Sequence, residues 1–439
     1  MKKIKLLYDA SLISEYYKKN SRRTGVYFVE YNIFNRLINS PYFDIFLYCR
    51  PNCIRDLKNT LNSDKYARYG LQIINDDGRI CRFLESIWIN TEEAARKNRI
   101  TRIIRNRILR LLNYIDSTRI EKRLSKYSVD AFFSAETIEI PKGVFENKDI
   151  YIFVFINDVI PLIFPQYFEG AAKGRVHPVA KAVNQFNERC NRIYGIAISE
   201  HSRSDFLRFT PRVTEKNTIV AHLACDESFV RCDDGERIRL VLEKYGIPVN
   251  KKYVLSLCTL EPRKNLMRAV DAFIRFIKKN EIHDLYMVLC GSGWDGFIEK
   301  IEKSIDDLGD YRDRVIITGY ADDADVPVLY SGAEWFVYTS QYEGFGLPPL
   351  EAMNCGCPVI TSNNSSLPEV VGDAGIMIDY DSIEQHVEAF EKMYYDEEFR
   401  KECTQKGLKQ AGKFSWDRCC SIIERFILDN IGRQVEVFE

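Results

Sequence analysis

The chain has 439 residues, more than one ordinary hydrophobic core supports, so two domains are expected. A hydrophobic content of 46% and an aromatic content of 13% exclude a largely disordered protein. A formal net charge of −1 excludes a general attraction to nucleic acid, and no nucleic-acid partner is expected.

The cysteines and the N-terminal stretch indicate the compartment. The thirteen cysteines are an odd number without paired CxxC spacing, which predicts reduced thiols in a cytoplasmic protein. Cys355 and Cys357 have no histidine nearby and do not indicate a tetrahedral metal site. In MKKIKLLYDASL, Asp9 interrupts the apolar run before it reaches the length of a signal core, and no run reaches the ~20 apolar residues that span a bilayer. A soluble or peripheral membrane protein is expected.

Short apolar runs in the first half of the chain predict buried strands. They lie at residues 4–8, 44–48, 129–134, 151–155 and 195–199. The first run is followed by the polar loop 14–24 and by Gly25, which opens the helical pattern VYFVEYNIFNRL. A glycine between a strand and a helix lets backbone amides approach a ligand, and a simple turn glycine is the alternative interpretation.

A basic segment occupies residues 96–126. It carries 11 Lys or Arg residues against two acids, and its apolar residues recur at helical spacing: Ile100, Ile103, Ile104, Ile108, Leu111, Leu112 and Ile115. Two interpretations stay open. The segment could lie on an anionic membrane surface, or it could be the solvated face of a helix that packs against the sheet.

Two polar motifs follow strands in the first half. Asn157 and Asp158 begin the sequence NDVIPL directly after the strand at 151–155. The sequence EHSRSD at residues 200–205 is expected to begin a helix, with Ser202 as its N-cap.

In the second half, basic residues and glycines follow the expected strands. After residues 253–257 comes CTLEPRKN, in which Arg263 and Lys264 precede an amphipathic helix. Two cations beside the free amides of a helix N-terminus suit a diphosphate. The run 286–289 leads to Gly291-Ser292-Gly293, and the run 315–320 ends in Gly319-Tyr320. Asp323-Ala-Asp325 has a DxD metal-site spacing, but acids at a helix N-terminus explain it better.

The stretch 342–358, YEGFGLPPLEAMNCGCP, is the most informative motif of the chain. Glu343 and Glu351 have seven residues between them. Proline favours the first helical position and glycine ends helices, so a short helix is expected over 348–355. Buried strands are expected at 334–338 and 358–361, which places Glu343 in a glycine-rich loop and Glu351 on the first turns of the helix.

This stretch resembles the E-x7-E element of retaining nucleotide-sugar glycosyltransferases of family 4, also called glycosyltransferase group 1. The resemblance extends to LEPRKNL at 260–266 and TSNNSSLPEVVGD at 361–373, and it covers the second half closely and the first half loosely. It implies the GT-B fold, an α/β fold of two Rossmann-like domains with parallel sheets facing a central cleft. It further implies an acceptor-binding domain at 1–230, a nucleotide-sugar-binding domain at 231–415 and a C-terminal helix at 416–434 that crosses back to the first domain.

The resemblance also implies roles for individual residues. Arg263 and Lys264 would neutralise the departing diphosphate without a metal, Glu343 would hold the sugar and Glu351 the ribose. Asp158 would orient sugar or acceptor, and a structural role capping its own loop is the alternative. Further donor contacts would come from Phe345, Gly346, Leu347, Gly319, Tyr320, Ser292 and Thr259, and acceptor or phosphate contacts from Gly25 and Asn157. Two positions depart from the family pattern: Asn157 stands where histidine is usual, and Cys258 where glycine is usual.

The implied activity is retaining, metal-independent hexosyl transfer from a nucleotide diphosphate donor, without a cofactor. GDP-mannose is preferred because the LEPRKNL form is typical of mannosyltransferase-like members. The acceptor would be a glycan or lipid-linked glycan in surface polysaccharide or lipopolysaccharide synthesis, reached in the cytoplasm or at the inner membrane face. A catalytically silent nucleotide-sugar-binding or scaffold relative is the alternative, favoured by the two departures.

Overall fold

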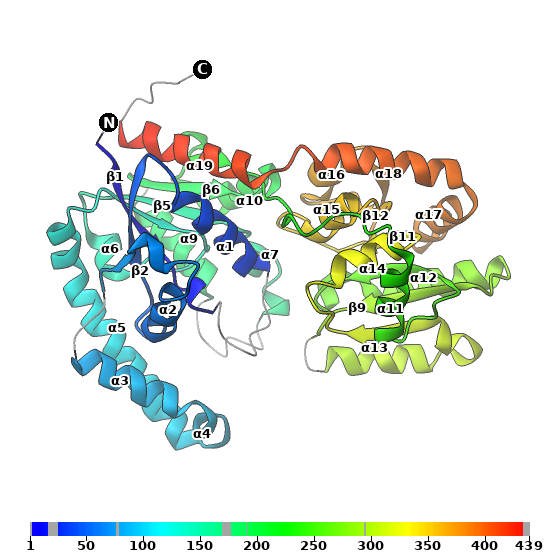
Figure 1. Ribbon diagram of the computed structural model, residues 1–439, viewed down its shortest axis with the longest axis horizontal. Coiled ribbons are helices and arrows are strands. Elements are labelled where there is room, and N and C mark those ends of the chain that lie inside the picture. Colours follow the sequence, from blue (N-terminus) through cyan, green and yellow to red (C-terminus); the bar gives the residue numbers. More distant parts are fainter. Residues whose placement is uncertain are drawn as a thin grey trace.

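The protein has two parallel sheets, each covered by helices and lying side by side (Figure 1). The computed structural model describes residues 2–15, 25–75, 79–168, 177–189, 191–293 and 296–432, without the side chains of 79, 80 and 96. Most of the loop predicted at 14–24 and the end of the helix predicted at 416–434 lie outside the described residues. The two sheets and their helices confirm the predicted α/β fold class.

The first sheet contains seven strands that all run parallel. Its central strands are buried on both faces, which explains why they appear in the sequence as continuous apolar runs. The strand order is β3 (Gln72–Ile73), β2 (Phe43–Tyr48), β1 (Ile4–Asp9), β4 (Ala131–Ser134), β5 (Tyr151–Ile156), β6 (Ile193–Ala197) and β7 (Thr218–Val220).

The second sheet contains six parallel strands. Trp335 and Tyr253 are fully buried in its core. The strand order is β10 (Val315–Gly319), β9 (Leu285–Cys290), β8 (Lys252–Leu257), β11 (Trp335–Tyr338), β12 (Val359–Ser362) and β13 (Gly375–Ile378).

Helices cover both sheets (Figure 1). Around the first sheet lie α1 (Gly25–Leu37), α2 (Ile54–Leu61), α3 (Arg79–Asn90), α4 (Glu92–Lys97), α5 (Arg99–Tyr127), α6 (Lys142–Glu146), α7 (Ile160–Ile163), α9 (Pro178–Glu188) and α10 (Glu200–Phe209). Around the second lie α11 (Gly235–Lys244), α12 (Leu266–Lys279), α13 (Phe297–Asp306), α14 (Val326–Gly332), α15 (Leu347–Asn354), α16 (Leu367–Val371), α17 (Ile383–Tyr395) and α18 (Glu397–Ala411). No helix in the described ranges has both the length and the apolar character needed to cross a membrane.

The last helix, α19 (Trp416–Ile431), lies over the first sheet although its sequence follows the second (Figure 1). Ser415 caps it by accepting a hydrogen bond from the Arg418 amide. Asp417 pairs with Arg36 of α1 at 2.7 Å, and Phe426 packs edge-on against Phe153 of β5. Helix α19 therefore packs on the first sheet and its helices. We refer to the first sheet with its helices and α19 as the first lobe, and to the second sheet with its helices as the second lobe.

Two local predictions were wrong, and two short strands were not predicted. Ser199, not Ser202, caps α10: the Ser199 side chain accepts from the Ser202 amide, and β6 therefore ends at Ala197 instead of continuing to 199. The basic segment is not one helix, because Asn98 adopts an extended conformation and caps α5. The short strands β3 and β13 were not predicted.

Candidate active site

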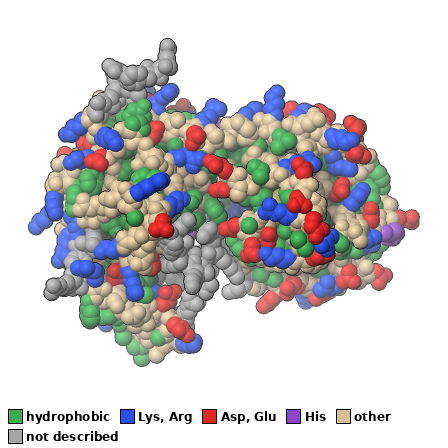
Figure 2. Space-filling model, in the orientation of Figure 1, with side chains coloured by type: hydrophobic (Ala, Val, Ile, Leu, Met, Phe, Trp, Pro, Cys, Tyr) green, Lys and Arg blue, Asp and Glu red, His purple; other side chains and the backbone are tan. Residues whose placement is uncertain are grey.

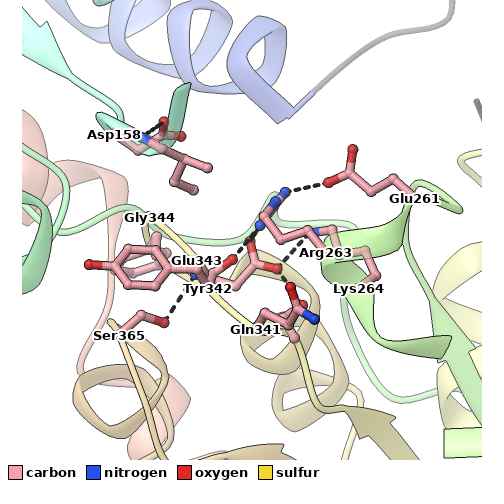
Figure 3. A network of polar contacts seen from close by, with 12 residues as sticks. Asp158, Glu261, Arg263, Lys264, Gln341, Tyr342, Glu343, Gly344 and Ser365 are labelled. Atoms are coloured by element: carbon pink, nitrogen blue, oxygen red, sulfur yellow. Dashed lines mark hydrogen bonds and ion pairs between the residues drawn. The ribbon is translucent and has the colours of Figure 1, made fainter. Parts of the chain in front are cut away.

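A buried cluster of charges lies at the carboxyl edge of the second sheet, where β8 and β11 end (Figure 3). Lys264 Nζ lies 2.6 Å from Glu343 Oε1, and Arg263 Nη1 lies 3.0 Å from Glu343 Oε2. The Ser340 hydroxyl donates to Glu343 Oε1 at 2.5 Å. Arg263 also pairs with Glu261 at 2.5 Å. The structure thus brings Arg263, Lys264 and Glu343 together, as the sequence predicted.

The charge state of Glu343 follows from these partners. Burial by itself would raise the pKa of this carboxyl, but Lys264 and Arg263 outweigh burial and lower the pKa to about 2. Glu343 is therefore an anion at any physiological pH. Its carboxylate is contacted by Lys264, Arg263 and the Ser340 hydroxyl, and the Tyr338 hydroxyl also hydrogen-bonds to it.

Local sequence explains how the cluster is held. Arg263 and Lys264 lie on a 3-10 turn, Pro262–Lys264, directly after β8. Asn265 follows with a φ of 59°, and its side-chain amide donates to the Thr339 and Tyr380 carbonyls, which ties this turn to the segment after β11. Gly346 directly precedes α15 and has a φ of 119°, a conformation that L side chains rarely adopt. The Glu343 loop can therefore reverse direction immediately before the helix.

Glu351 lies on α15 in a different environment. Burial raises the pKa of its carboxyl to about 7, although a hydrogen bond from the Tyr330 hydroxyl, at 3.1 Å, works in the opposite direction. Asp226 and Asp323 raise that pKa further. The two acids of the E-x7-E element therefore have different charge states near neutral pH.

The first lobe approaches the Glu343 loop through the segment after β5. A Cβ atom added to Gly344 would lie 2.6 Å from the Asn157 carbonyl oxygen and 3.0 Å from Asp158 Cβ, so only glycine fits there. Asp158 Oδ1 accepts from the Ile160 amide at 3.0 Å, and burial raises the pKa of this carboxyl. The Asn157 side chain donates to the Ala135 carbonyl. The structure thus places both residues beside the acidic loop.

The remaining predicted residues lie at different distances from this cluster. Gly25 begins α1, and a Cβ there would contact Leu347 at 3.9 Å, so these two lie across the lobes from one another. Thr259 is exposed in the loop after β8, and the Ser292 carbonyl accepts from the Leu260 amide in the same loop.

Three more donor-site predictions involve Gly319, Tyr320 and Phe345. Gly319 ends β10 with a φ of 72°, and Tyr320 is 45% exposed with its hydroxyl 2.9 Å from Asp323 Oδ1. The Phe345 side chain is buried and packs edge-on against Phe414, so only its backbone remains for a ligand.

The family position occupied by Cys258 is tightly packed. A Cβ on Gly291 would lie 1.9 Å from the Cys258 carbonyl oxygen, so Gly291 is the residue that permits the close approach of the two loops. Burial raises the pKa of the Cys258 thiol to about 12. The twelve cysteines in the described residues are all free thiols.

The DxD sequence is engaged in other contacts. Asp325 pairs with Lys244 at 2.5 Å and accepts from the Tyr245 hydroxyl, while Asp323 faces Tyr320. Within the described parts of the chain, no group of three or more His, Cys, Asp or Glu side chains is arranged to hold a metal ion.

Sequence reasoning missed the residues that join the two lobes. Ser199 and Ser202 donate to the Gly344 carbonyl, and Tyr342 reaches His201 and Asp205 on α10. The sequence EHSRSD marked a helix start but carried no signal for these partners, because about 140 residues separate them along the chain.

Residues 238–410 match the model of a family described as glycosyl transferases group 1. The chain therefore contains a glycosyltransferase group 1 domain. The matched range contains Arg263, Lys264, Glu343 and Glu351, so the charge cluster lies within the matched family domain.

Similar proteins support this family assignment for the chain. It is 33% identical over 263 residues to O-antigen chain mannosyltransferase B of Escherichia coli, an alignment that covers 60% of this chain and 66% of that protein. It is 32% identical over 281 residues to the serotype-specific mannosyltransferase WbdA of Escherichia coli, covering 64% of this chain and 33% of WbdA. The chain therefore spans under two thirds of either relative.

Solved structures support the fold of the glycosyltransferase. Anabaena HepE in complex with UDP and glucose superposes with a TM-score of 0.66 at 15% identity, covering 97% of this chain and 99% of HepE. WaaG, a glycosyltransferase involved in lipopolysaccharide biosynthesis, superposes with a TM-score of 0.62 at 14% identity, covering 95% and 99%. The predicted GT-B fold is thereby confirmed.

Proposed function

We propose that this glycosyltransferase transfers a hexosyl group from a nucleotide diphosphate donor to a glycan or lipid-linked glycan, with retention of anomeric configuration. One observation carries the proposal: a buried carboxylate, Glu343, is held by two cations at the carboxyl edge of a parallel sheet, and the next residue, Gly344, packs against Asp158 of the other lobe. Ligands of α/β proteins bind at such edges. The family domain supports the same reaction class.

The chemistry of the proposed reaction follows from the cluster. Cleavage of the donor bond leaves negative charge on the diphosphate, which Arg263 and Lys264 can stabilise together with the amides before α15. Glu343 would accept a hydrogen bond from a sugar hydroxyl through a carboxylate oxygen. Asp158 would orient the sugar or the acceptor from the opposite side. With the leaving charge met by protein cations, the proposed reaction needs neither a metal nor a cofactor.

GDP-mannose is the proposed donor. The relatives named above are mannosyltransferases, and both concern O-antigen or serotype-specific glycans by name. The loop after β10 adds a physical argument, since the exposed Tyr320 offers a face for stacking a base and Asp323 offers acceptor oxygens for the N–H groups of guanine. We place Glu351 at the ribose, where an ionised carboxylate can accept from two hydroxyls.

The test is a donor panel. GDP-, UDP- and ADP-sugars are incubated with the protein and with membrane extract as the acceptor source, and nucleotide release and product configuration are measured. Lys264→Ala is expected to reduce the rate by about 10²- to 10³-fold, as for other oxyanion donors. Lys300→Ala, an exposed lysine on α13, serves as the control. Equal rates for the two variants would overturn the assignment.

A second candidate function is a catalytically silent nucleotide-sugar-binding protein. The observation that favours it is Asn157, whose amide cannot take a proton where the family has histidine. Saturable binding of a nucleotide sugar without turnover for any donor and acceptor would establish this alternative. Turnover of any nucleotide sugar would exclude it.

We further propose that the surface formed by α3 and α5 binds anionic lipid, which would place the protein at the inner membrane face. Six apolar side chains there are exposed: Phe83, Ile100, Ile103, Ile104, Leu111 and Tyr114. Arg102, Arg107 and Arg110 are exposed among them, and Figure 2 shows basic and hydrophobic side chains together in this part of the molecule. Such a combination is typical of an interfacial helix. Arg105 does not belong to this surface, because it stacks on Trp88 at 3.8 Å.

Liposome flotation tests the lipid surface. Changing Arg102, Arg107 and Arg110 together to glutamate is expected to abolish flotation with anionic vesicles, because each basic residue contributes about 1 kcal/mol near such a surface. The same change at three exposed lysines of the second lobe, Lys251, Lys300 and Lys303, is the matched control. Unchanged flotation of the arginine variant would refute lipid binding by this surface.

A further inference from the structure

Tyr342, which precedes Glu343 in the chain, reaches from the second lobe into the first. Its hydroxyl donates to Asp205 of α10 and lies 2.6 Å from His201 Nε2. Its ring meets the ring of Phe164 edge-on, with the centroids 5.3 Å apart. The side chain of Tyr342 is thus held by the first lobe on its hydroxyl and on its ring.

The hydrogen bonds of Tyr342 fix the proton arrangement. A phenol hydroxyl has one hydrogen, and Tyr342 uses it to donate a hydrogen bond to the Asp205 carboxylate. His201 Nε2 must therefore carry a hydrogen and donate to the Tyr342 oxygen. Asp205 is 4% exposed and additionally pairs with Arg208, so its carboxylate is a fixed acceptor. The three side chains form one chain of donors and acceptors across the lobes.

The backbone of the same loop is bound from both sides. The Tyr342 carbonyl accepts from Arg263, the cation that also pairs with Glu343. Two residues later, the Gly344 carbonyl accepts from Ser199 at 2.7 Å and from Ser202 at 2.8 Å. Glu343 therefore lies between two residues that are each bonded to α10 or its cap. A shift of α10 relative to the second lobe would move both flanks of Glu343.

We propose that Tyr342 is a positioning residue through which α10 of the first lobe aligns Glu343 for sugar transfer. This inference rests on the proposed function. Alignment of the reacting groups then depends on the docked arrangement of the lobes, whereas nucleotide affinity does not, because Arg263, Lys264 and Glu351 all belong to the second lobe. The hydroxyl of Tyr342, and not only its ring, carries the effect.

The experiment is Tyr342→Phe in the full chain, which keeps the ring contacts and removes the hydroxyl. Loss of a hydrogen bond to a charged group lowers a rate or equilibrium constant by about 10- to 100-fold. We therefore expect kcat to fall by that factor, while the affinity for GDP changes by less than about 2-fold. Asp205→Asn keeps an acceptor oxygen for the Tyr342 hydroxyl and is expected to retain more of the rate than Tyr342→Phe. A purely structural role would not produce this split or this rescue.

The matched control is Tyr394→Phe. Tyr394 of α17 also donates to an aspartate, Asp284, but Asp284 directly precedes β9 at the opposite edge of the second sheet, so no change in kcat is expected. An unchanged kcat for Tyr342→Phe, or an equal loss of kcat and GDP affinity, would overturn the inference.

A second measurement separates this inference from the proposed function. Small-angle X-ray scattering of the ligand-free protein is expected to give a larger radius of gyration for Tyr342→Phe than for wild type and Tyr394→Phe. Equal radii for all three proteins would overturn the inference. Failure of the wild type to turn over any nucleotide sugar would overturn the proposed function, and the scattering result would still decide whether Tyr342 holds the lobes.

Discussion

The pH dependence of donor binding tests the environment of Glu351. Burial raises the pKa of this carboxyl to about 7 in the free protein, so the carboxyl gains or loses its proton in the physiological range. Only the ionised form offers both oxygens as acceptors to a pair of ribose hydroxyls. We therefore expect donor affinity to increase with pH.

The size of this effect follows from the pKa. With a pKa of about 7, about 9% of Glu351 is ionised at pH 6 and about 91% at pH 8. If the ionised form alone binds ribose, the apparent Kd falls about tenfold over this range, equivalent to about 1.4 kcal/mol. Binding at pH 7 should release about half a proton per donor bound.

Isothermal calorimetry with a nucleotide sugar measures both quantities. The sugar-esterified diphosphate is a better probe than a free nucleotide, because a terminal phosphate itself titrates near pH 6. In Glu351→Gln the pH dependence should disappear, and the affinity should be no higher than that of the wild type at pH 6. A flat profile for the wild type, or the same slope in Glu351→Gln, would refute this role of Glu351.

Three more predictions concern the acidic loop and its partner lobe. The pKa of Glu343 is about 2, so its ion pairs stabilise the fold above pH ~4.5 and this stabilisation is lost as the pH falls toward 2. Glu343→Gln should abolish transfer. In urea unfolding, the same change should lower the free energy of unfolding by roughly 3 kcal/mol at pH 7 but by little near pH 2. Gly344→Ala should lose about 1–3 kcal/mol in the same assay because its Cβ would collide with Asn157, whereas Gly235→Ala, with open space, should not. Asp158→Asn keeps an acceptor for the Ile160 amide, so transfer should fall without a change in melting temperature.

Much of the architecture could be predicted from local sequence. Parallel strands buried on both faces leave continuous apolar runs, which is why β5 and β11 were found within one or two residues. The two-residue strand β3 is too short to leave such a run. Apolar runs also did not predict the residue at which each helix begins. Ser199 and Ser202 are both capable caps, and the choice between them depends on where β6 ends.

The candidate site was predictable only within one lobe. Arg263, Lys264 and Glu343 each follow a strand of the same parallel sheet, so topology alone brings them to one edge. The contacts of Tyr342 with α10 depend on how the two lobes dock, and no periodicity in the sequence encodes that arrangement. The pKa values of Glu343 and Glu351 depend on which side chains lie beside them in the folded protein, so the sequence alone did not predict them either.

The two acids of the E-x7-E element show why neighbours, and not spacing, determine a role. Glu343 lies beside two cations and stays ionised, so it can act as a permanent acceptor but not as a proton donor. Glu351 lies near Asp226 and Asp323 without a cation among the causes of its shift, so it holds a proton until about pH 7. A ligand that supplies hydroxyl donors near Glu351 would replace the missing cation and favour ionisation. Donor binding is therefore expected to favour ionisation of Glu351, so that both acids of the E-x7-E element are anions in the complex.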